Sequence, residues 1–321
     1  MGKINIHSMA LERYPVSIMK DRRRKEAVEQ AARSIFSFCA LIAFLGVLFI
    51  TLYMMISGVP ALLQVGLKEL LLGRVWAPVG PDPEFGIFYI ILTSLAGTGL
   101  ALVIGVPAGI LAAVFLAEVA GRPLAEIMRT AVELLACIPS VIYGLLGIYL
   151  LNPLIYRLEL KLFAGSETHR FTGGANLLSA SLVLAVMILP TVINISEAAI
   201  RAVGPEIRAA SFALGASRMQ TVFKSVLPAA KPGIVTAVVL GMGRALGEAF
   251  AITLVSGGSV NVPLPFHSVR FLTTAIVSEM GYAQGLHRQV LFTIGLVLFL
   301  FVMGANMALT RILKRGADLY G

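Results

Sequence analysis

The chain has 321 residues, of which 58% are hydrophobic and only 13% carry a charged side chain. A folded protein in water needs more charge than this on its surface, so the composition excludes an ordinary water-soluble enzyme and indicates an integral membrane protein. The net charge is +9, but the basic residues flank apolar segments and form no basic folded face, which argues against a nucleic-acid partner. Cys39 and Cys137 lie inside apolar runs and are expected to be small core residues.

Six apolar runs follow one another along the chain. A helix that crosses a bilayer needs roughly 20 mostly apolar residues. The runs cover residues 34–67, 85–117, 134–156, 171–196, 233–255 and 289–310. The first follows a basic stretch but shows no small-residue cleavage pattern, so we expect a retained anchor. The sequence therefore predicts an all-α integral membrane fold with about six transmembrane helices.

These runs divide the chain into four parts. We expect a basic tail at residues 1–34, a first span with an external segment at 35–84, a five-helix core at 85–314 and a tail at 315–321. With the N-terminus inside, 18 Lys and Arg residues lie on the inner side and seven on the outer side. Because basic loops stay in the cytoplasm, both termini are predicted to be cytoplasmic.

The usual signs of catalysis are absent from the sequence. No G-x-x-x-x-G-K-[ST] string occurs, so the chain cannot be its own P-loop ATPase. The four histidines are scattered and give no metal-ligand spacing. We expect no catalytic residue, no metal and no cofactor in this chain.

Three prolines fall inside apolar runs. They are Pro107, Pro139 and Pro190. Each removes one helix hydrogen bond and can bend or break its helix. Such bends would let helices line a path and rearrange as gates, and a static kink relieved by neighbouring helices is the alternative.

Two G-x-x-x-G pairs lie in the same apolar runs. They are Gly105 with Gly109, and Gly243 with Gly247. Small residues at this spacing allow close approach of another helix. Both pairs therefore permit a close helix contact, although such pairs are common by chance.

Arg244 and Glu248 interrupt the fifth apolar run. At this spacing in one helix they share a face, about 6 Å apart along the axis. A charge at the bilayer centre costs at least about 2.5–3.5 kcal/mol, which directs both side chains to the bundle interior or a watery path. They form either a structural ion pair, or a site where Arg244 binds a passing oxyanion and Glu248 weakens that binding enough for release.

Residues 205–228 form a distinctive segment before the fifth span. It begins Pro205-Glu-Ile-Arg-Ala-Ala-Ser-Phe-Ala-Leu-Gly215 and ends Val226-Leu-Pro228. We expect two short helices, broken at Gly215, where a left-handed turn is tolerated, and stopped by Pro228. An apolar face is expected from Ile207, Ala210, Leu214, Val222 and Phe223. A hairpin lying on lipid would give the same pattern.

The same segment resembles the EAA loop of ABC importer permeases, a coupling helix that docks into a groove of the ATPase subunit. Gly215, the Leu227-Pro228 pair and the position before the penultimate span carry the match. Ala209 stands where that motif usually has Glu, Ser225 stands where Ile is usual, and Glu206 is a candidate replacement for the acid. The coupling residues that the resemblance implies are Glu206, Ala209, Ala210, Gly215, Leu227 and Pro228.

Further strings resemble the phosphate importer's permeases, and the C-type subunit fits better than its partner. They are Glu133-Leu-Leu-Ala-Cys-Ile-Pro-Ser-Val-Ile-Tyr-Gly-Leu-Leu-Gly147, Phe85-Gly86 and Gly243-Arg-Ala-Leu-Gly-Glu248. Sulfate and molybdate permeases carry a string similar to the last one, so that string does not distinguish the substrates. The region of Ser140 resembles the phosphate permeases and therefore favours phosphate. The resemblance implies a type I ABC importer permease (MetI-like) fold, with Arg244, Glu248 and Ser140 along the substrate path.

The resemblance also implies a complex in a bacterial inner membrane. A second homologous permease, two ATP-binding-cassette ATPases that hold ATP and Mg, and an external phosphate-binding protein would work with this chain. Phosphate would enter the cell by alternating access. The alternatives are a permease for sulfate or molybdate, a proton-coupled secondary transporter that uses Arg244 and Glu248, and a non-transporting scaffold.

Overall fold

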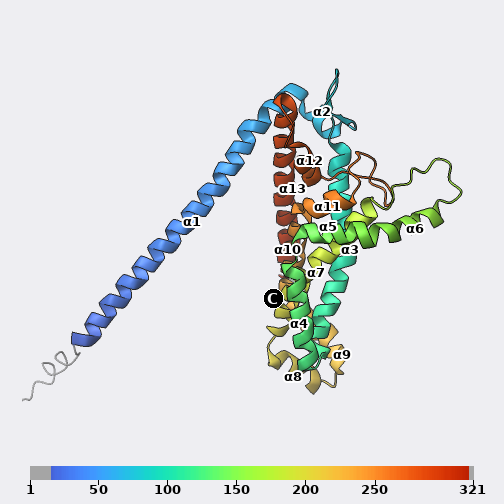
Figure 1. The fold of residues 1–321 in the computed structure, drawn as a ribbon. Helices are drawn as coiled ribbons and strands as arrows, with labels where there is room; N and C mark the ends of the chain where they lie inside the picture. The colour runs from blue at the N-terminus through green and yellow to red at the C-terminus, as the bar shows by residue number, and fades with distance from the viewer. Residues whose placement is uncertain (1–15, 318–321) are drawn as a thin grey trace, which may run out of the picture. The chain divides into compact units, whose positions relative to one another are not determined.

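The computed structural model describes residues 16–317, so parts of both predicted tails lie outside the described residues. Within them the chain forms helices, one two-stranded hairpin and connecting loops (Figure 1). Residues 1–54 and 55–321 are two separate units, and the described part of the first unit belongs to α1 (Val16–Val65). The all-α class is confirmed.

Six helical stretches among the described residues are long and apolar enough to cross a membrane. They are Val28–Val65, Phe88–Val119, Ser140–Leu162, Leu177–Arg201, Arg218–Gly247 and Gly285–Ala308. The predicted number of spans is therefore confirmed, although two of the six take a different course from the predicted one.

The helices of the second unit pack around four clusters of buried apolar side chains. The long helices of the second unit are α3 (Phe88–Val114), α4 (Arg122–Cys137), α7 (Leu177–Arg201), α10 (Leu227–Gly247) and α13 (Gly285–Ala317). The short helices of this unit are α2 (Leu67–Leu72), α5 (Ser140–Leu146), α6 (Asn152–Leu162), α8 (Pro205–Ala213), α9 (Arg218–Thr221), α11 (Phe250–Val255) and α12 (Leu272–Glu279). The hairpin pairs β1 (Trp76–Ala77) with β2 (Glu84–Phe85) in antiparallel register, Trp76 opposite Phe85.

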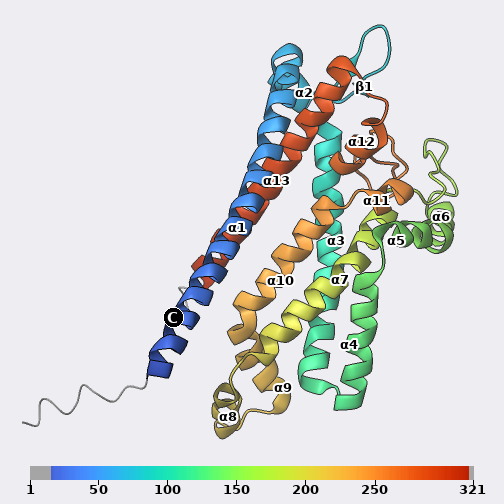
Figure 2. The ribbon, with the colours of Figure 1, turned by 60° about the vertical axis from the view of Figure 1, so that its left-hand side comes forward.

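The span predicted over 134–156 is divided at Pro139, one of the three prolines expected to bend or break a helix. α4 ends at Cys137, Ile138 is extended (φ −68°, ψ 126°), and α5 begins after Pro139. A π-turn (Gly147–Leu151) and α6 follow. Figures 1 and 2 show α4 running beside α3 and α7, whereas α5 and α6 run across them. Proline restricts the residue before it to extended backbone and donates no hydrogen bond, so one helix cannot continue through this point.

The fifth apolar run also differs from its prediction. The helix begins earlier, at α9, and passes through a π-turn (Val222–Val226) into α10. Pro228 lies in the first turn of α10 and does not stop the preceding helix, because the wider π-turn just before it accommodates the missing backbone donor. At the other end, α10 stops at Gly247 and Glu248 is extended (φ −71°, ψ 134°). Arg244 and Glu248 therefore do not share one helix, which corrects the prediction.

Small residues bring α3 against α7 at the centre of the unit. A Cβ added to Gly105 would lie 2.9 Å from Ile188 Cδ1, and one added to Gly109 would lie 2.7 Å from Val192 Cγ1. Both contacts are shorter than a real Cβ tolerates, so the two glycines allow the approach. The predicted helix contact at this pair is confirmed.

The second glycine pair does not make a helix contact. A Cβ added to Gly243 or Gly247 would meet no atom within 4 Å. α10 approaches α7 through Gly241 instead, where a Cβ would lie 3.1 Å from Val192 Cγ2. The approach that the spacing permits at this pair is not used, because spacing alone does not say which face of the helix meets a neighbour.

Pro107 and Pro190 lie inside the unbroken helices α3 and α7. Of the three prolines predicted to bend or gate, Pro139 alone stands at a break between helices.

Candidate functional site

A short helical hairpin projects at one end of the second unit. α8 and α9 meet at Gly215, whose φ of +80° is left-handed and favours glycine. Ser217 Oγ accepts from Gln220 N at 3.3 Å while Gln220 Oε1 accepts from Ser217 N at 2.8 Å, a reciprocal cap on α9. The two short helices and the turn predicted at Gly215 are confirmed.

Apolar side chains cover the outside of this hairpin. Leu214 at its tip is 89% exposed, and Ile207, Phe212 and Met219 are also exposed. Val222, predicted to share their face, is buried in the bundle. Exposed apolar groups gathered on one projecting element are typical of a surface that a partner covers.

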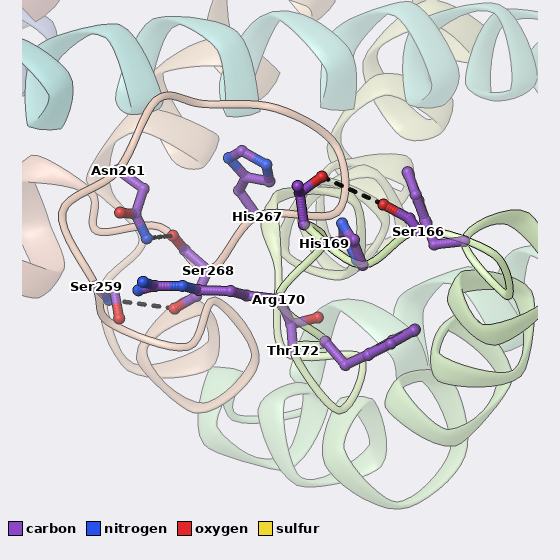
Figure 3. A pocket seen from close by; sticks show the side chains of 11 residues that line it. Ser166, His169, Arg170, Thr172, Ser259, Asn261, His267 and Ser268 are labelled. Atoms are coloured by element: carbon purple, nitrogen blue, oxygen red, sulfur yellow. Dashed lines mark hydrogen bonds between the residues drawn. The ribbon is translucent and has the colours of Figure 1, made fainter.

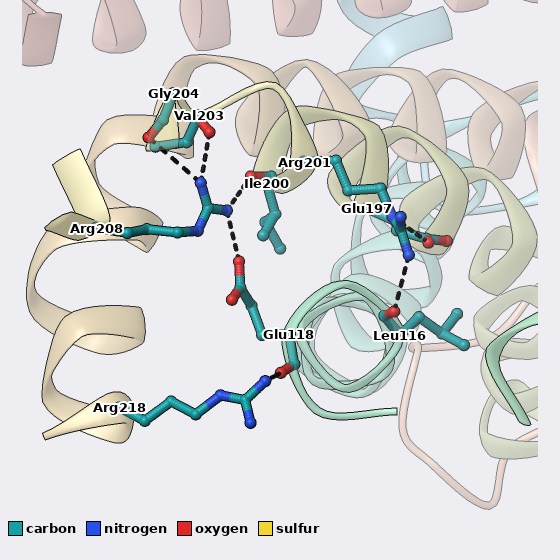
Figure 4. A network of polar contacts seen from close by, with 9 residues as sticks. All are labelled: Leu116, Glu118, Glu197, Ile200, Arg201, Val203, Gly204, Arg208 and Arg218. Atoms are coloured by element: carbon teal, nitrogen blue, oxygen red, sulfur yellow. Dashed lines mark hydrogen bonds and ion pairs between the residues drawn. The ribbon is translucent and has the colours of Figure 1, made fainter. Parts of the chain in front are cut away.

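Glu118 joins the hairpin to the end of α3. Its Oε1 accepts a hydrogen bond from Arg208 Nη2 at 2.6 Å, and its backbone carbonyl accepts one from Arg218 Nη2 at 2.6 Å (Figure 4). Arg208 also donates to the carbonyls of Val203 (2.5 Å) and Ile200 (3.1 Å). Ile200 lies in the last turn of α7, where backbone carbonyls lose their i+4 helical partners, and Val203 follows the helix. Both helices of the hairpin are thus braced from one point.

A second carboxylate holds the helices just above the hairpin. Glu197 Oε1 accepts from Arg129 Nε at 2.7 Å and from Arg201 Nε at 2.8 Å. Arg201 also donates to the Leu116 carbonyl at 3.1 Å (Figure 4). The cluster ties α4, α7 and the π-turn that follows α3 (Phe115–Val119) into one support.

Sequence reasoning missed Glu118, Arg208 and Arg218 as a group. The available signal was an acid directly after a long apolar run, which indicates a membrane boundary. Glu118 and Arg208 are 90 residues apart in the sequence. Only the packing of α3 beside α7 brings them together.

The predicted coupling residues divide between the hairpin and the start of α10. Glu206, Ala209 and Ala210 are exposed on α8. Glu206 lies in the first turn, where the helix dipole favours an acid. No residue of α8 is buried, so this helix offers its side chains outward.

Leu227 and Pro228 border a cavity of ≈ 300 Å³ at the start of α10. Phe223, Lys231 and Ile234 line the rest of it. Neither Leu227 nor Pro228 is on the hairpin itself. The structure places them where the hairpin's second helix enters the bundle.

Arg244 and Glu248 flank the break between α10 and α11. Arg244, in the last turn of α10, donates from Nη1 to Thr191 Oγ1 at 3.5 Å. Glu248 Oε1 accepts from Ala251 N at 3.0 Å, and the Glu248 carbonyl accepts from Thr273 Oγ1 at 2.6 Å. Within the described residues no ion pair joins Arg244 to Glu248. Most donors of the guanidinium are therefore available to an anion.

Ser140 begins α5, directly after Pro139. α5 packs on α11, because a Cβ added to Gly144 would lie 2.7 Å from Leu254 Cδ1 and 3.0 Å from Ala251 Cα. Since Glu248 caps α11, the α4–α5 break and the α10–α11 break belong to one packed region. No hydrogen bond among the described residues links Ser140 to Arg244 or Glu248.

No group of three metal-ligating side chains occurs in the part of the chain that the structure describes. The arrangement offers an exposed apolar hairpin at one end and a helix break flanked by two half-buried charged side chains.

Comparison with known proteins identifies the architecture. Residues 105–317 match the family model described as a binding-protein-dependent transport system inner membrane component. The chain is 37% identical over 295 residues to the probable ABC transporter permease protein YqgH of Bacillus subtilis, covering 89% of this chain and 92% of that protein. It is 32% identical over 283 residues to the phosphate transport system permease protein PstC of Haemophilus influenzae, covering 85% and 89%.

Solved structures agree on the fold. A chain of a bacterial alginate ABC transporter, solved with a pentasaccharide-bound periplasmic protein, aligns with a TM-score of 0.62 at 18% identity and covers 89% of this chain and 96% of its own. An inward-facing MetNI methionine ABC transporter aligns with a TM-score of 0.51 at 24% identity, covering 78% and 97%. The predicted MetI-like fold is confirmed. The chain belongs to the family of binding-protein-dependent transport system inner membrane components, the multi-pass permease subunits of ABC transporters.

Proposed function

We propose that this chain is one permease subunit of an ATP-driven importer that moves inorganic phosphate into a bacterial cell by alternating access. Proteins named phosphate transport system permease PstC are 32% and 34% identical to it over most of its length. The relative at 37% identity is named only as a probable ABC permease, so sulfate and molybdate are the competing cargoes.

The braced hairpin with an exposed apolar tip is the observation that carries the importer proposal. Leu214 projects from a hairpin whose two helices Glu118 holds in place. A preorganised apolar tip is suited to a groove on a partner, because little ordering entropy is lost on docking. The partner would be an ATP-binding-cassette ATPase, two copies of which hold ATP and Mg while this chain does no chemistry.

The proposed complex has further members and a defined sidedness. A second homologous permease would pack beside residues 85–314, and an external phosphate-binding protein would deliver the cargo. Basic residues concentrate on the hairpin side of the predicted topology. The hairpin and both termini are therefore assigned to the cytoplasm of an inner-membrane protein.

The path through the permease would pass the α10–α11 break. A discontinuous helix exposes backbone groups and a charged side chain inside a bundle, which is a recurring way to hold an ion at mid-membrane. Arg244 would bind the oxyanion, while Glu248 holds α11 through Ala251 N. The breaks beside Pro139 and Glu248 would act as hinges, and Pro107 and Pro190 as bends.

Substitution of Gly215 tests the coupling role of the hairpin. Nothing lies within 4 Å of an added Cβ, so φ of +80° is the main constraint. Gly215→Val forces a β-branched residue into the left-handed region at a cost of about 1–2 kcal/mol or more, whereas Gly215→Asn tolerates it. We expect the valine variant to lose ATPase co-purification and transport-coupled ATP hydrolysis and the asparagine variant to keep both. Full coupling in Gly215→Val would show that the assignment is wrong.

The cargo is tested by uptake into vesicles that contain ATP and carry the whole complex with its external binding protein. We expect labelled phosphate to enter in preference to sulfate or molybdate, and to enter after the proton gradient is collapsed. Preference for sulfate would overturn the cargo. Uptake that stops with the gradient would favour a secondary transporter.

A further inference from the structure

A polar cavity of ≈ 550 Å³ lies at the end of the second unit opposite the hairpin. Two loops form it, residues 163–172 after α6 and residues 259–268 after α11 (Figure 3). The second loop is fixed to the start of α7, where Leu177 N donates to His267 O at 3.1 Å and Leu178 N to Pro265 O at 2.8 Å. The cavity walls are therefore held by the central helix of the bundle.

Arg170 supplies the charge of this cavity. Its side chain extends from the first loop toward Ser259 and Ser268 of the second (Figure 3). Among the described residues Arg170 has no ion pair. Hydroxyl groups of Ser166 and Thr168 complete the polar wall. A guanidinium surrounded by hydroxyl donors is a suitable setting for an oxyanion.

No carboxylate lines the cavity. Glu159, which contacts the first loop, is fully buried and accepts from His169 Nε2 at 2.8 Å and from Thr172 N and Oγ1 at 3.0 Å each. Glu167 belongs to the same loop but is exposed outside the lining. The negative charges that would repel an anion are thus engaged elsewhere or turned away.

A neighbouring cavity of ≈ 340 Å³ extends the positive surface and shares Ser259 with the first. Arg74 and Arg270 line it. Arg270 is paired with Glu279, whereas Arg74 forms no ion pair within the described chain. Two unpaired guanidinium groups on adjoining concave surfaces raise the local concentration of anions.

Two hydrogen-bond acceptors in the first cavity distinguish between oxyanions. His267 Nδ1 lies 3.2 Å from the Val262 carbonyl oxygen, so the neutral ring that carries its proton on Nδ1 donates there and presents Nε2 as an acceptor. Asn261 Nδ2 donates to the Ser268 carbonyl at 3.0 Å, which leaves Oδ1 as an acceptor. Phosphate carries a proton at neutral pH and can donate to such acceptors, whereas sulfate cannot.

We infer that this cavity binds a proton-bearing oxyanion of the phosphate class, with Arg170 as its charge partner, as an external site ahead of the α10–α11 path. The inference rests on the proposed function for its side of the membrane and for the link to transport. Binding at the cavity itself can be measured without transport.

The test uses the whole complex in nanodiscs without the external binding protein. A reporter thiol is placed beside the cavity wall by Gly165→Cys, where an added Cβ meets no atom within 4 Å, in a chain that also carries Cys39→Ser and Cys137→Ser. The rate of modification by a membrane-impermeant maleimide is measured against inorganic phosphate and against sulfate at constant ionic strength. Arg170→Gln removes the charge partner, Arg170→Lys retains a positive charge, and Arg157→Gln is the matched control, an exposed arginine of α6 outside the lining.

We expect phosphate to slow modification in a saturable manner and sulfate to do so only at concentrations at least about tenfold higher. The phosphate concentration for half protection should rise at least about tenfold in Arg170→Gln, less in Arg170→Lys, and less than about twofold in Arg157→Gln. Absence of protection, equal protection by sulfate, or equal shifts in the two glutamine variants would overturn the inference. Phosphate uptake by the wild-type complex with its binding protein, measured in parallel, shows separately whether the proposed function holds.

Discussion

Glu118 is the residue at which the end of α3 meets both helices of the hairpin. Its side chain is engaged by Arg208, and its backbone carbonyl is engaged by Arg218. The two contacts therefore respond differently to substitution. A side-chain change removes the first and leaves the second, so α8 and α9 can be uncoupled from each other experimentally.

Glu118→Gln is expected to loosen α8 more than α9. Hydrogen bonds to charged groups contribute about 1.5–3 kcal/mol to stability. The low end applies here because the Arg208 side chain is 24% exposed to solvent. Amide hydrogen exchange in α8 should become roughly tenfold faster, which corresponds to about 1.4 kcal/mol. Glu133→Gln, an exposed acid on α4, is the control and should leave exchange in the hairpin unchanged. Equally faster amide exchange in α8 and α9 would contradict separate support of the two helices by the side chain and the carbonyl of Glu118.

At the scale of elements, α3 and α7 form the centre of the unit because small residues line their contact. Gly105 and Gly109 are buried on the α7 face of α3, whereas Gly99 of the same helix is exposed. A Cβ added at Gly99 would meet nothing within 4 Å. The same substitution at the two kinds of position should therefore have opposite effects on stability.

Gly109→Ala is expected to destabilise the protein, and Gly99→Ala is expected to stabilise it slightly. The added Cβ at Gly109 would lie 2.7 Å from Cγ1 of the fully buried Val192, and such overpacking costs about 1–3 kcal/mol. At Gly99 only the helix preference for alanine remains, worth about 0.5–1 kcal/mol. Thermal unfolding of the purified complex measures both. A melting temperature that rises in both variants would show that α3 and α7 are not in close contact at Gly109.

Three π-turns mark the ends of helices in the described part of the chain. They are Phe115–Val119, Gly147–Leu151 and Val222–Val226. The first carries Glu118, and the third leads from the hairpin into α10. Such turns often occur at functional sites because they change the helix register locally. The second lies between α5 and α6, away from the contacts of Glu118.

At the scale of the whole second unit, the hairpin and the polar cavity lie at opposite ends and the α10–α11 break lies in the interior. If the proposed function holds, uptake requires all three regions, whereas assembly requires only the packing between them. Variants at the break can therefore separate a transport role from a structural one.

Arg244→Gln and Glu248→Gln are expected to assemble normally and to retain ATPase activity while phosphate uptake falls at least about tenfold. Glutamine keeps the oxygen that caps Ala251 N, so α11 should remain folded. The double variant should not recover uptake. If the single variants fail to assemble and the double variant restores both assembly and uptake, the two residues form a structural pair and the path assignment is wrong.

The sequence alone determined the membrane class, the number of spans and the hairpin turn. Apolar runs of sufficient length are imposed by the bilayer itself, because backbone groups in lipid must bond within one helix. Gly215 was predictable because a left-handed φ is a local property that few residues other than glycine tolerate. Each of these features depends on residues close together in the chain.

Only the tertiary structure decided which segments meet. The end of α10 before Glu248 differs from what the local pattern indicates, and the pairing of Glu118 with Arg208 lies beyond it. The cavity around Arg170 combines two loops about 90 residues apart in the sequence. Helix spacing shows that a face is apolar, but the neighbour it packs against is set by the shapes of all the helices together.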